Sequence, residues 1–285
     1  MHRNLPFTVW NLLREFDPDR KGYLSATRFY KASYLLHRKL KQRRIQTGLP
    51  WCWYIYGPEV RMDLIPAEIY IREERPDGTR YYFGAEPGSQ EPEPGTRAPI
   101  LYEIRALHKK RLGTGDMVRE IYKNPPKKML SLLKEYEDLV DSLEQGQTLI
   151  GGDLSALMLA RLDRIERSYS EEDFGEMYAE FLRLDDLLRL LLRDRPERIR
   201  QLGGTIHSFR ELVATKASAL FNENLPEGFA GERMELMRRR LEAFRPGLDA
   251  LEKNLLKDIP RKDGDRRHTA GLARAASIVT REESE

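Results

Sequence analysis

The sequence predicts a mainly α-helical protein with one small β-hairpin near its N-terminus. Apolar residues recur at spacings of three and four through most of the second half of the 285-residue chain, which is typical of amphipathic helices. The pair Asp77-Gly78 lies between two short runs rich in Tyr, Ile and Phe, which is a strong hairpin signal. No apolar run approaches the length of a membrane-spanning helix, and the single cysteine excludes an intramolecular disulfide.

Two helices are expected before the hairpin. The first spans roughly residues 6–16 and is broken by the polar, Pro- and Gly-containing segment 17–22. Ser25 is a good N-cap for a second helix of about twenty residues. The apolar stripe of this second helix consists of Phe29, Ala32, Leu36 and Leu40.

The segment Trp51–Tyr56 is aromatic and too short for a helix, so it is expected to form a strand or a buried loop. The hairpin then joins residues 69–71 to residues 80–83. The order helix, helix, hairpin is found in winged-helix domains. We therefore expect a winged-helix-like domain over residues 1–145, which includes a Gly-, Pro- and Glu-rich linker at 84–99.

A helical bundle is expected over residues 153–260, followed by a disordered tail at 261–285. Ser170 and Asp173 resemble a capping box at the start of one helix, and Pro246 predicts a kink in the last. The apolar stripes of the second half are Met129, Leu132, Tyr136, Leu139 and Leu143; Phe174, Met177, Phe181, Leu184, Leu188 and Leu191; Ile206, Phe209, Val213 and Leu220; and Met234, Met237, Leu241, Phe244, Leu248, Leu251 and Leu255.

The second helix carries a cluster of basic residues and no acid. Such a cluster is the solvated face of a surface helix, or it neutralises DNA phosphates along a groove. Lys31, Arg38 and Lys41 fall opposite the apolar stripe and are expected to face outward. The candidate nucleic-acid-binding residues are Arg28, Lys31, Arg38, Lys39, Lys41, Arg43 and Arg44.

Patterns that would indicate catalysis or a metal site are weak. Segment 17–28 imitates a calcium loop, but Lys21 and Arg28 occupy two ligand positions, so a plain turn is expected. The five histidines lack metal-ligand spacing. His37 is more typical of a helix histidine than of a phosphate ligand, and Cys52, between two tryptophans, is expected to be buried and neutral. We expect no catalytic residue, no metal and no cofactor.

Two short segments resemble a known family. Tyr34-Leu35-Leu36-His37-Arg38, followed by Trp51-Cys52-Trp53-Tyr54-Ile55-Tyr56-Gly57-Pro58, is similar to a pattern of SocA/Panacea-type antitoxins and YwgA-type prokaryotic proteins. Met117–Lys127, in which a tyrosine precedes two prolines, is similar to a later helix of that family. The resemblance covers roughly residues 6–143. It implies a winged-helix-like core without catalytic residues and a role in toxin neutralisation or host defence.

Together these features predict a non-enzymatic, cytoplasmic binding protein. The expected function is that of a DNA-linked regulator or a component of a defence or toxin–antitoxin system. The alternative is a protein–protein adaptor that uses the C-terminal bundle and does not contact DNA. The candidate partners are double-stranded DNA, and a protein or a second copy of the chain bound through the C-terminal helices. No membrane partner is expected.

Overall fold

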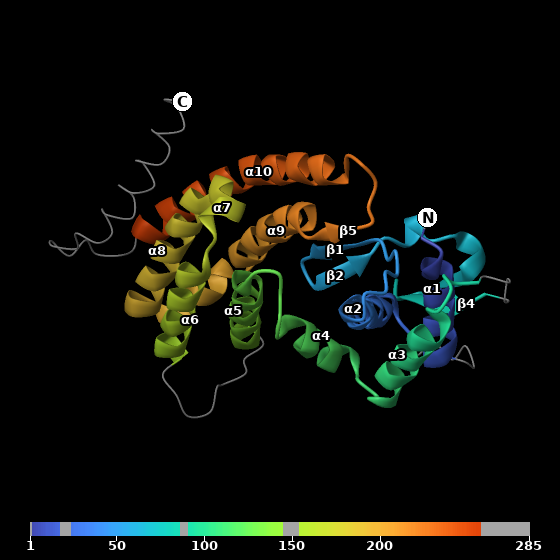
Figure 1. Cartoon of the computed structure of the whole chain (residues 1–285). Helices are drawn as coiled ribbons and strands as arrows, with labels where there is room; N and C mark the ends of the chain where they lie inside the picture. The colour runs from blue at the N-terminus through green and yellow to red at the C-terminus, as the bar shows by residue number, and fades with distance from the viewer. Residues whose placement is uncertain (1, 18–23, 86–90, 145–153, 258–285) are drawn as a thin grey trace. The chain divides into compact units, whose positions relative to one another are not determined.

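The computed structural model describes residues 2–17, 24–85, 91–144 and 154–257 (Figure 1). Within these residues the protein is mainly helical with a small β component, which confirms the predicted fold class. The chain forms two compact units: unit 1 is Met1–Asn124 with Ala217–Ala230, and unit 2 is Pro125–Lys216 with Gly231–Glu285. The expected division at residues 145–153 and the expected tail at 261–285 lie outside the described residues.

Unit 1 is built around a central helix, α2, which packs against α3, α4 and strand β2 (Figure 1). The predicted N-cap is confirmed, because the Ser25 hydroxyl oxygen accepts a hydrogen bond from the backbone N–H of Arg28 at 3.4 Å. The helices of unit 1 are α1 (Asn4–Phe16), α2 (Ala26–Gln42), α3 (Arg97–Lys109) and α4 (Thr114–Tyr122).

A three-stranded antiparallel sheet covers one side of α2. Its order is β2-β1-β5, formed by β1 (Trp51–Tyr54), β2 (Gly57–Val60) and β5 (Asn222–Glu223). Segment Trp51–Tyr56 was expected to form a strand or a buried loop, and its first four residues form a strand. Gly57 has φ +84°, a conformation that L side chains rarely adopt, so the tight turn favours glycine.

The predicted hairpin is also confirmed. Strand β3 (Tyr70–Glu74) pairs with β4 (Arg80–Gly84) in antiparallel register, from Tyr70 opposite Gly84 to Glu74 opposite Arg80. Gly78 in the connecting turn has φ +78°, a conformation that L side chains rarely adopt. Two short 3₁₀ turns, Met62–Leu64 and Ala67–Ile69, lead into β3. The finer winged-helix arrangement stays a prediction.

Unit 2 is a helical bundle whose predicted apolar stripes are largely buried. The predicted capping box is not formed, since the Ser170 hydroxyl donates to the Asp173 carboxylate at 2.5 Å and caps no backbone N–H. The expected single helix after Ser170 is instead divided into three. Unit 2 contains α5 (Lys128–Glu144), α6 (Leu154–Ser168), α7 (Glu171–Phe174), the 3₁₀ turn Gly175–Met177, α8 (Tyr178–Asp194), the 3₁₀ helix Pro196–Leu202, and most of α9 (Gly203–Leu220) and α10 (Phe229–Lys257).

Candidate nucleic-acid interface

The middle of α2 is buried on all sides. Every residue from 31 to 37 is buried, because the β-sheet packs on one side of the helix and α3 and α4 pack on others. The expectation that Lys31 faces outward is therefore wrong. A helix whose middle is enclosed in this way cannot lie lengthwise in a DNA groove, and the exposed cations of α2 lie at its C-terminal end.

Lys31 serves the fold. Its side-chain nitrogen donates hydrogen bonds to the carbonyl oxygens of Tyr56 and Pro58, at 2.5 and 3.0 Å, and so holds the turn between β1 and β2 against α2. Burial lowers the pKa of Lys31 to about 7, although the charge of Glu59 opposes this shift. The apolar stripe of α2 did not predict that Lys31 is buried, because a cation opposite such a stripe is normally exposed.

Three of the other predicted cations interact with a backbone oxygen or a side chain within unit 1. The Arg28 guanidinium is half-buried and donates to the carbonyl oxygen of Leu112 at 3.2 Å. Arg38 is half-buried with its guanidinium 5.9 Å from the centre of the Tyr34 ring. Lys41 is exposed and forms an ion pair with Glu223 of β5.

His37 lies in a polar cluster with the same glutamate. Its Nδ1 is 2.8 Å from the Thr47 hydroxyl and its Nε2 is 3.1 Å from the Glu223 carboxylate. Burial lowers the pKa of His37, and the charge of Glu223 opposes that shift. The side chain is buried, whereas the sequence indicated a helix-surface or half-buried histidine, and it joins α2 to β5.

The remaining predicted cations, Lys39, Arg43 and Arg44, are exposed at the C-terminal end of α2. Lys39 and Arg43 are four residues apart and share one side of the helix. Arg43 forms an ion pair with Glu103 of α3 at 2.6 Å, and its guanidinium lies 5.2 Å from the centre of the Tyr102 ring.

Helix α3 extends this basic surface. It runs antiparallel to α2, because residues 102 and 103 lie at the end of α2 whereas Leu112 contacts Arg28 near its start. Tyr102, Arg105 and Lys109 are exposed at spacings of three and four, so they share one face of α3. Sequence reasoning missed these residues, although the run Lys109-Lys110-Arg111 was a visible signal.

Two arginines near this surface have a left-handed backbone. Arg44 has φ +61° and Arg111 has φ +48°, and each follows the last turn of a helix, where glycine is the usual residue. The N–H groups of Arg44 and Ile45 donate to the carbonyl oxygens of Lys41 and Leu40, which is a complete Schellman motif. A non-glycine residue in this conformation costs about 1 kcal/mol.

We refer to Lys39, Arg43, Arg44, Tyr102, Arg105, Lys109, Lys110 and Arg111 as the basic face. Among the described residues, no carboxylate lies within ion-pair distance of its members other than Glu103 on Arg43. Segments 26–44 and 97–123 together hold fourteen Lys and Arg and three acids, a formal charge of +11 in a chain of +3. The rest of the chain is therefore net acidic, so the positive charge is concentrated in these two segments.

Glu120 on α4 lies within this positive field. Its carboxylate accepts a hydrogen bond from Lys123 at 2.6 Å, and this bond is the main reason that its pKa is lowered. The charges of Lys110 and Arg38 lower the pKa further. The Glu120 carboxylate thus lies in the electrostatic field of cations from α2, from the end of α3 and from the end of α4.

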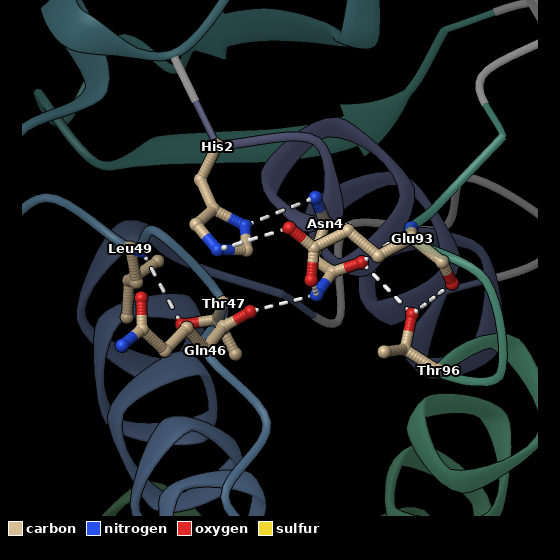
Figure 2. A network of polar contacts seen from close by, with 7 residues as sticks. All are labelled: His2, Asn4, Gln46, Thr47, Leu49, Glu93 and Thr96. Atoms are coloured by element: carbon tan, nitrogen blue, oxygen red, sulfur yellow. Dashed lines mark hydrogen bonds and ion pairs between the residues drawn. The ribbon is translucent and has the colours of Figure 1, made fainter.

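A part-buried polar network around the buried Asn4 side chain holds the helices that carry the basic face (Figure 2). The Asn4 side chain donates to the carbonyl oxygen of Gln46 at 2.8 Å, and its oxygen accepts from the Glu93 N–H and the Thr96 hydroxyl, both at 2.9 Å. His2 extends the network, with Nε2 3.5 Å from Glu93. The start of α1 therefore fixes the loop after α2 and the segment before α3. Residues 91–96 lie within the range expected to be a linker, of which residues 86–90 are outside the described residues.

The structure offers little support for other chemistry in the described ranges. One group of three acids, Glu137, Asp138 and Asp141, is close enough to share an ion, but Glu137 already pairs with His207 and Arg210. Cys52 is buried, as expected. Most of the calcium-loop segment, residues 18–23, is outside the described residues. No described helix combines the length and the apolar character that a membrane span requires.

No protein-family model, curated protein or solved structure matches this chain. The resemblance of Tyr34–Pro58 and Met117–Lys127 to SocA/Panacea-type and YwgA-type proteins therefore stays a prediction.

Proposed function

We propose that this protein is a non-enzymatic nucleic-acid-binding protein that contacts backbone phosphates through the basic face. The observation that carries the proposal is the set of exposed cations of the basic face, of which only Arg43 has a carboxylate partner among the described residues. Lysine and arginine side chains in this state neutralise phosphates and release counterions. A protein that needed only a soluble surface would be expected to intersperse both signs of charge.

The left-handed backbone conformations of Arg44 and Arg111 favour the same proposal. At positions 44 and 111 the usual glycine would remove a backbone cost of about 1 kcal/mol each, yet the chain has a charged side chain at both. Such a cost is expected where the side chain serves a function. The proposed setting is cytoplasmic and DNA-linked, and the resemblance of the N-terminal half adds a defence or toxin–antitoxin context.

Salt-dependent binding tests this proposal. Full-length protein is titrated into fluorescently labelled duplex and single-stranded oligonucleotides over a range of salt concentrations. The variant Lys39→Gln/Arg105→Gln/Lys109→Gln should weaken binding by orders of magnitude at low salt. It should also reduce the slope of log K against log salt by about three, roughly one for each lost phosphate contact.

The matched control removes three exposed cations of unit 2, Arg164, Arg200 and Lys253, and should leave both affinity and slope nearly unchanged. Equal losses in the two triple variants would show that total charge, and not the basic face, determines binding. If the wild type binds no oligonucleotide at low salt, the proposal is wrong.

The alternative function is that of a protein–protein adaptor, and one observation favours it. An open groove of about 600 Å³ runs between α9 and α10 and is partly lined by the apolar side chains of Leu212, Phe244, Leu248 and Leu251. An amphipathic helix of a partner is the ligand that such grooves accept. This alternative would be favoured if the wild type binds no nucleic acid and the variant Lys39→Gln/Arg105→Gln/Lys109→Gln still binds a partner protein.

A further inference from the structure

Tyr102 is unusual among the large side chains of the described residues. It is 61% exposed, whereas every described aromatic side chain of unit 1 except Tyr102 and Tyr56 is buried or half-buried. Arg105 and Lys109 lie three and seven residues further along the same helical face, and Arg43 of α2 reaches over the ring. An exposed aromatic ring among cations is the arrangement with which proteins bind unpaired nucleotides.

We propose that Tyr102 is a stacking platform for an unpaired base, so that the preferred ligand of the basic face is a single-stranded segment of nucleic acid. This inference rests on the proposed function and specifies its ligand. Arg43 would contribute a cation–π contact to the tyrosine ring, and its ion pair with Glu103 holds the guanidinium in place. Arg105 and Lys109 would contact the phosphates that flank the stacked base.

The burial of α2 supports the choice of a single strand. Direct readout of the major groove uses a helix or strand that enters the groove, and residues 31–37 of α2 are enclosed and cannot enter it. In a duplex the bases are already stacked on their neighbours, so an exposed tyrosine gains nothing from them. In a single strand every base presents a π-face, and each stacked base contributes about 1–3 kcal/mol.

The test compares three oligonucleotides of equal length with full-length protein: a single strand, its duplex, and a single strand that contains abasic sites. The abasic strand keeps the phosphates and removes the stacking partner. Tyr102→Ala should weaken binding of the intact single strand roughly 5- to 150-fold, which corresponds to the loss of one stacked base. It should change the affinity for the duplex and for the abasic strand less than twofold, roughly the scatter expected where no stacking contact is lost.

Two variants serve as controls. Tyr102→Phe keeps the aromatic ring and should retain the affinity of the wild type for the single strand. Tyr56→Ala removes a tyrosine of similar exposure, 58%, at the turn between β1 and β2, and should have no effect. Because both tyrosines are exposed, circular dichroism and the melting temperature should stay unchanged in all three variants.

The outcomes separate this inference from the proposed function. If Tyr102→Ala binds the single strand like the wild type, or loses affinity for all three ligands equally, Tyr102 is not a stacking platform, while salt-dependent binding would still support the proposed function. If no ligand binds in a salt-dependent way, both proposals are wrong. The same titration with DNA and RNA single strands of identical sequence then shows which is preferred, since only RNA carries the 2′-hydroxyl.

Discussion

The side-chain nitrogen of Lys31 donates a hydrogen bond to the carbonyl oxygen of Pro58, 3.0 Å away, and so connects the interior of α2 to the start of β2. Lysine is rarely buried without a carboxylate partner. Here backbone oxygens satisfy the amine, and its pKa of about 7 means that the group is only partly charged near neutral pH. The contact stabilises the turn that brings Gly57 close to α4.

The pKa of Lys31 predicts a pH dependence of stability. Between pH 7 and its ordinary pKa of 10.5, the lysine keeps its proton in the unfolded chain and loses it in the folded protein. The unfolded state therefore binds more protons, and the free energy of unfolding should rise with pH across this window, by at most about 1.4 kcal/mol per unit. Urea denaturation at several pH values measures the slope.

The variant Lys31→Met should lose this slope, whatever its absolute stability. Lys39→Met, which replaces an exposed lysine of the same helix, should keep the slope. A slope that persists unchanged in Lys31→Met would mean that Lys31 remains fully charged in the folded protein.

Replacing Arg44 by glycine should change stability and binding in opposite directions. Glycine adopts φ +61° without a steric cost, so Arg44→Gly should raise the free energy of unfolding by up to about 1 kcal/mol. The same change removes one cation of the basic face and should weaken nucleic-acid binding. Thermal denaturation and fluorescence anisotropy give the two values.

Lys39→Ala is the matched control, since it removes one exposed charge near the end of α2 without changing a left-handed position. It should weaken binding without a gain in stability. Binding of wild-type strength by Arg44→Gly would exclude Arg44 from the interface and leave its backbone conformation without a functional reason.

A buried ion pair is expected to stabilise unit 2 strongly. Glu137 of α5 lies 2.7 Å from Arg210 and 2.6 Å from His207, both on α9, and the Glu137 and Arg210 side chains are only 6% exposed. Glu137→Gln leaves a buried guanidinium without this carboxylate and should lower the free energy of unfolding by about 3 kcal/mol. Asp138→Asn, which removes an exposed i,i+4 pair with Lys134, should cost less than about 0.5 kcal/mol. Similar losses of unfolding free energy in the two variants would show that burial does not strengthen the contribution of the Glu137 ion pair.

Local sequence signals predicted much of the fold. The Ser25 cap, the hairpin turn at Asp77-Gly78 and the stripes of the bundle depend on residues near one another in the chain, and all are present. The position of Lys31 depends on non-local packing of β2, α3 and α4 around α2, which helix periodicity does not contain.

Only part of the candidate site was predicted, because the rest depends on contacts between residues far apart in the sequence. The cations at the end of α2 follow from the charge pattern of one helix. The contribution of α3 requires knowledge that Arg43 reaches Tyr102 across 59 residues of sequence. The pairing of Lys41 and His37 with Glu223 is more distant still and had no local signal.

The pairing of β5 with β1 has a consequence for synthesis. Trp51 and Cys52 of β1 pair with Glu223 and Asn222, so unit 1 completes its sheet with residues that follow the segment Pro125–Lys216. A ribosome adds about 5–20 residues per second, so the roughly 170 residues between β1 and β5 take on the order of 10–30 s to emerge. During that interval the edge of β1 that later pairs with β5 is unpaired on the nascent chain and can bind chaperones or mispair. Unit 1 can complete its sheet only after residue 223 has left the ribosomal exit tunnel.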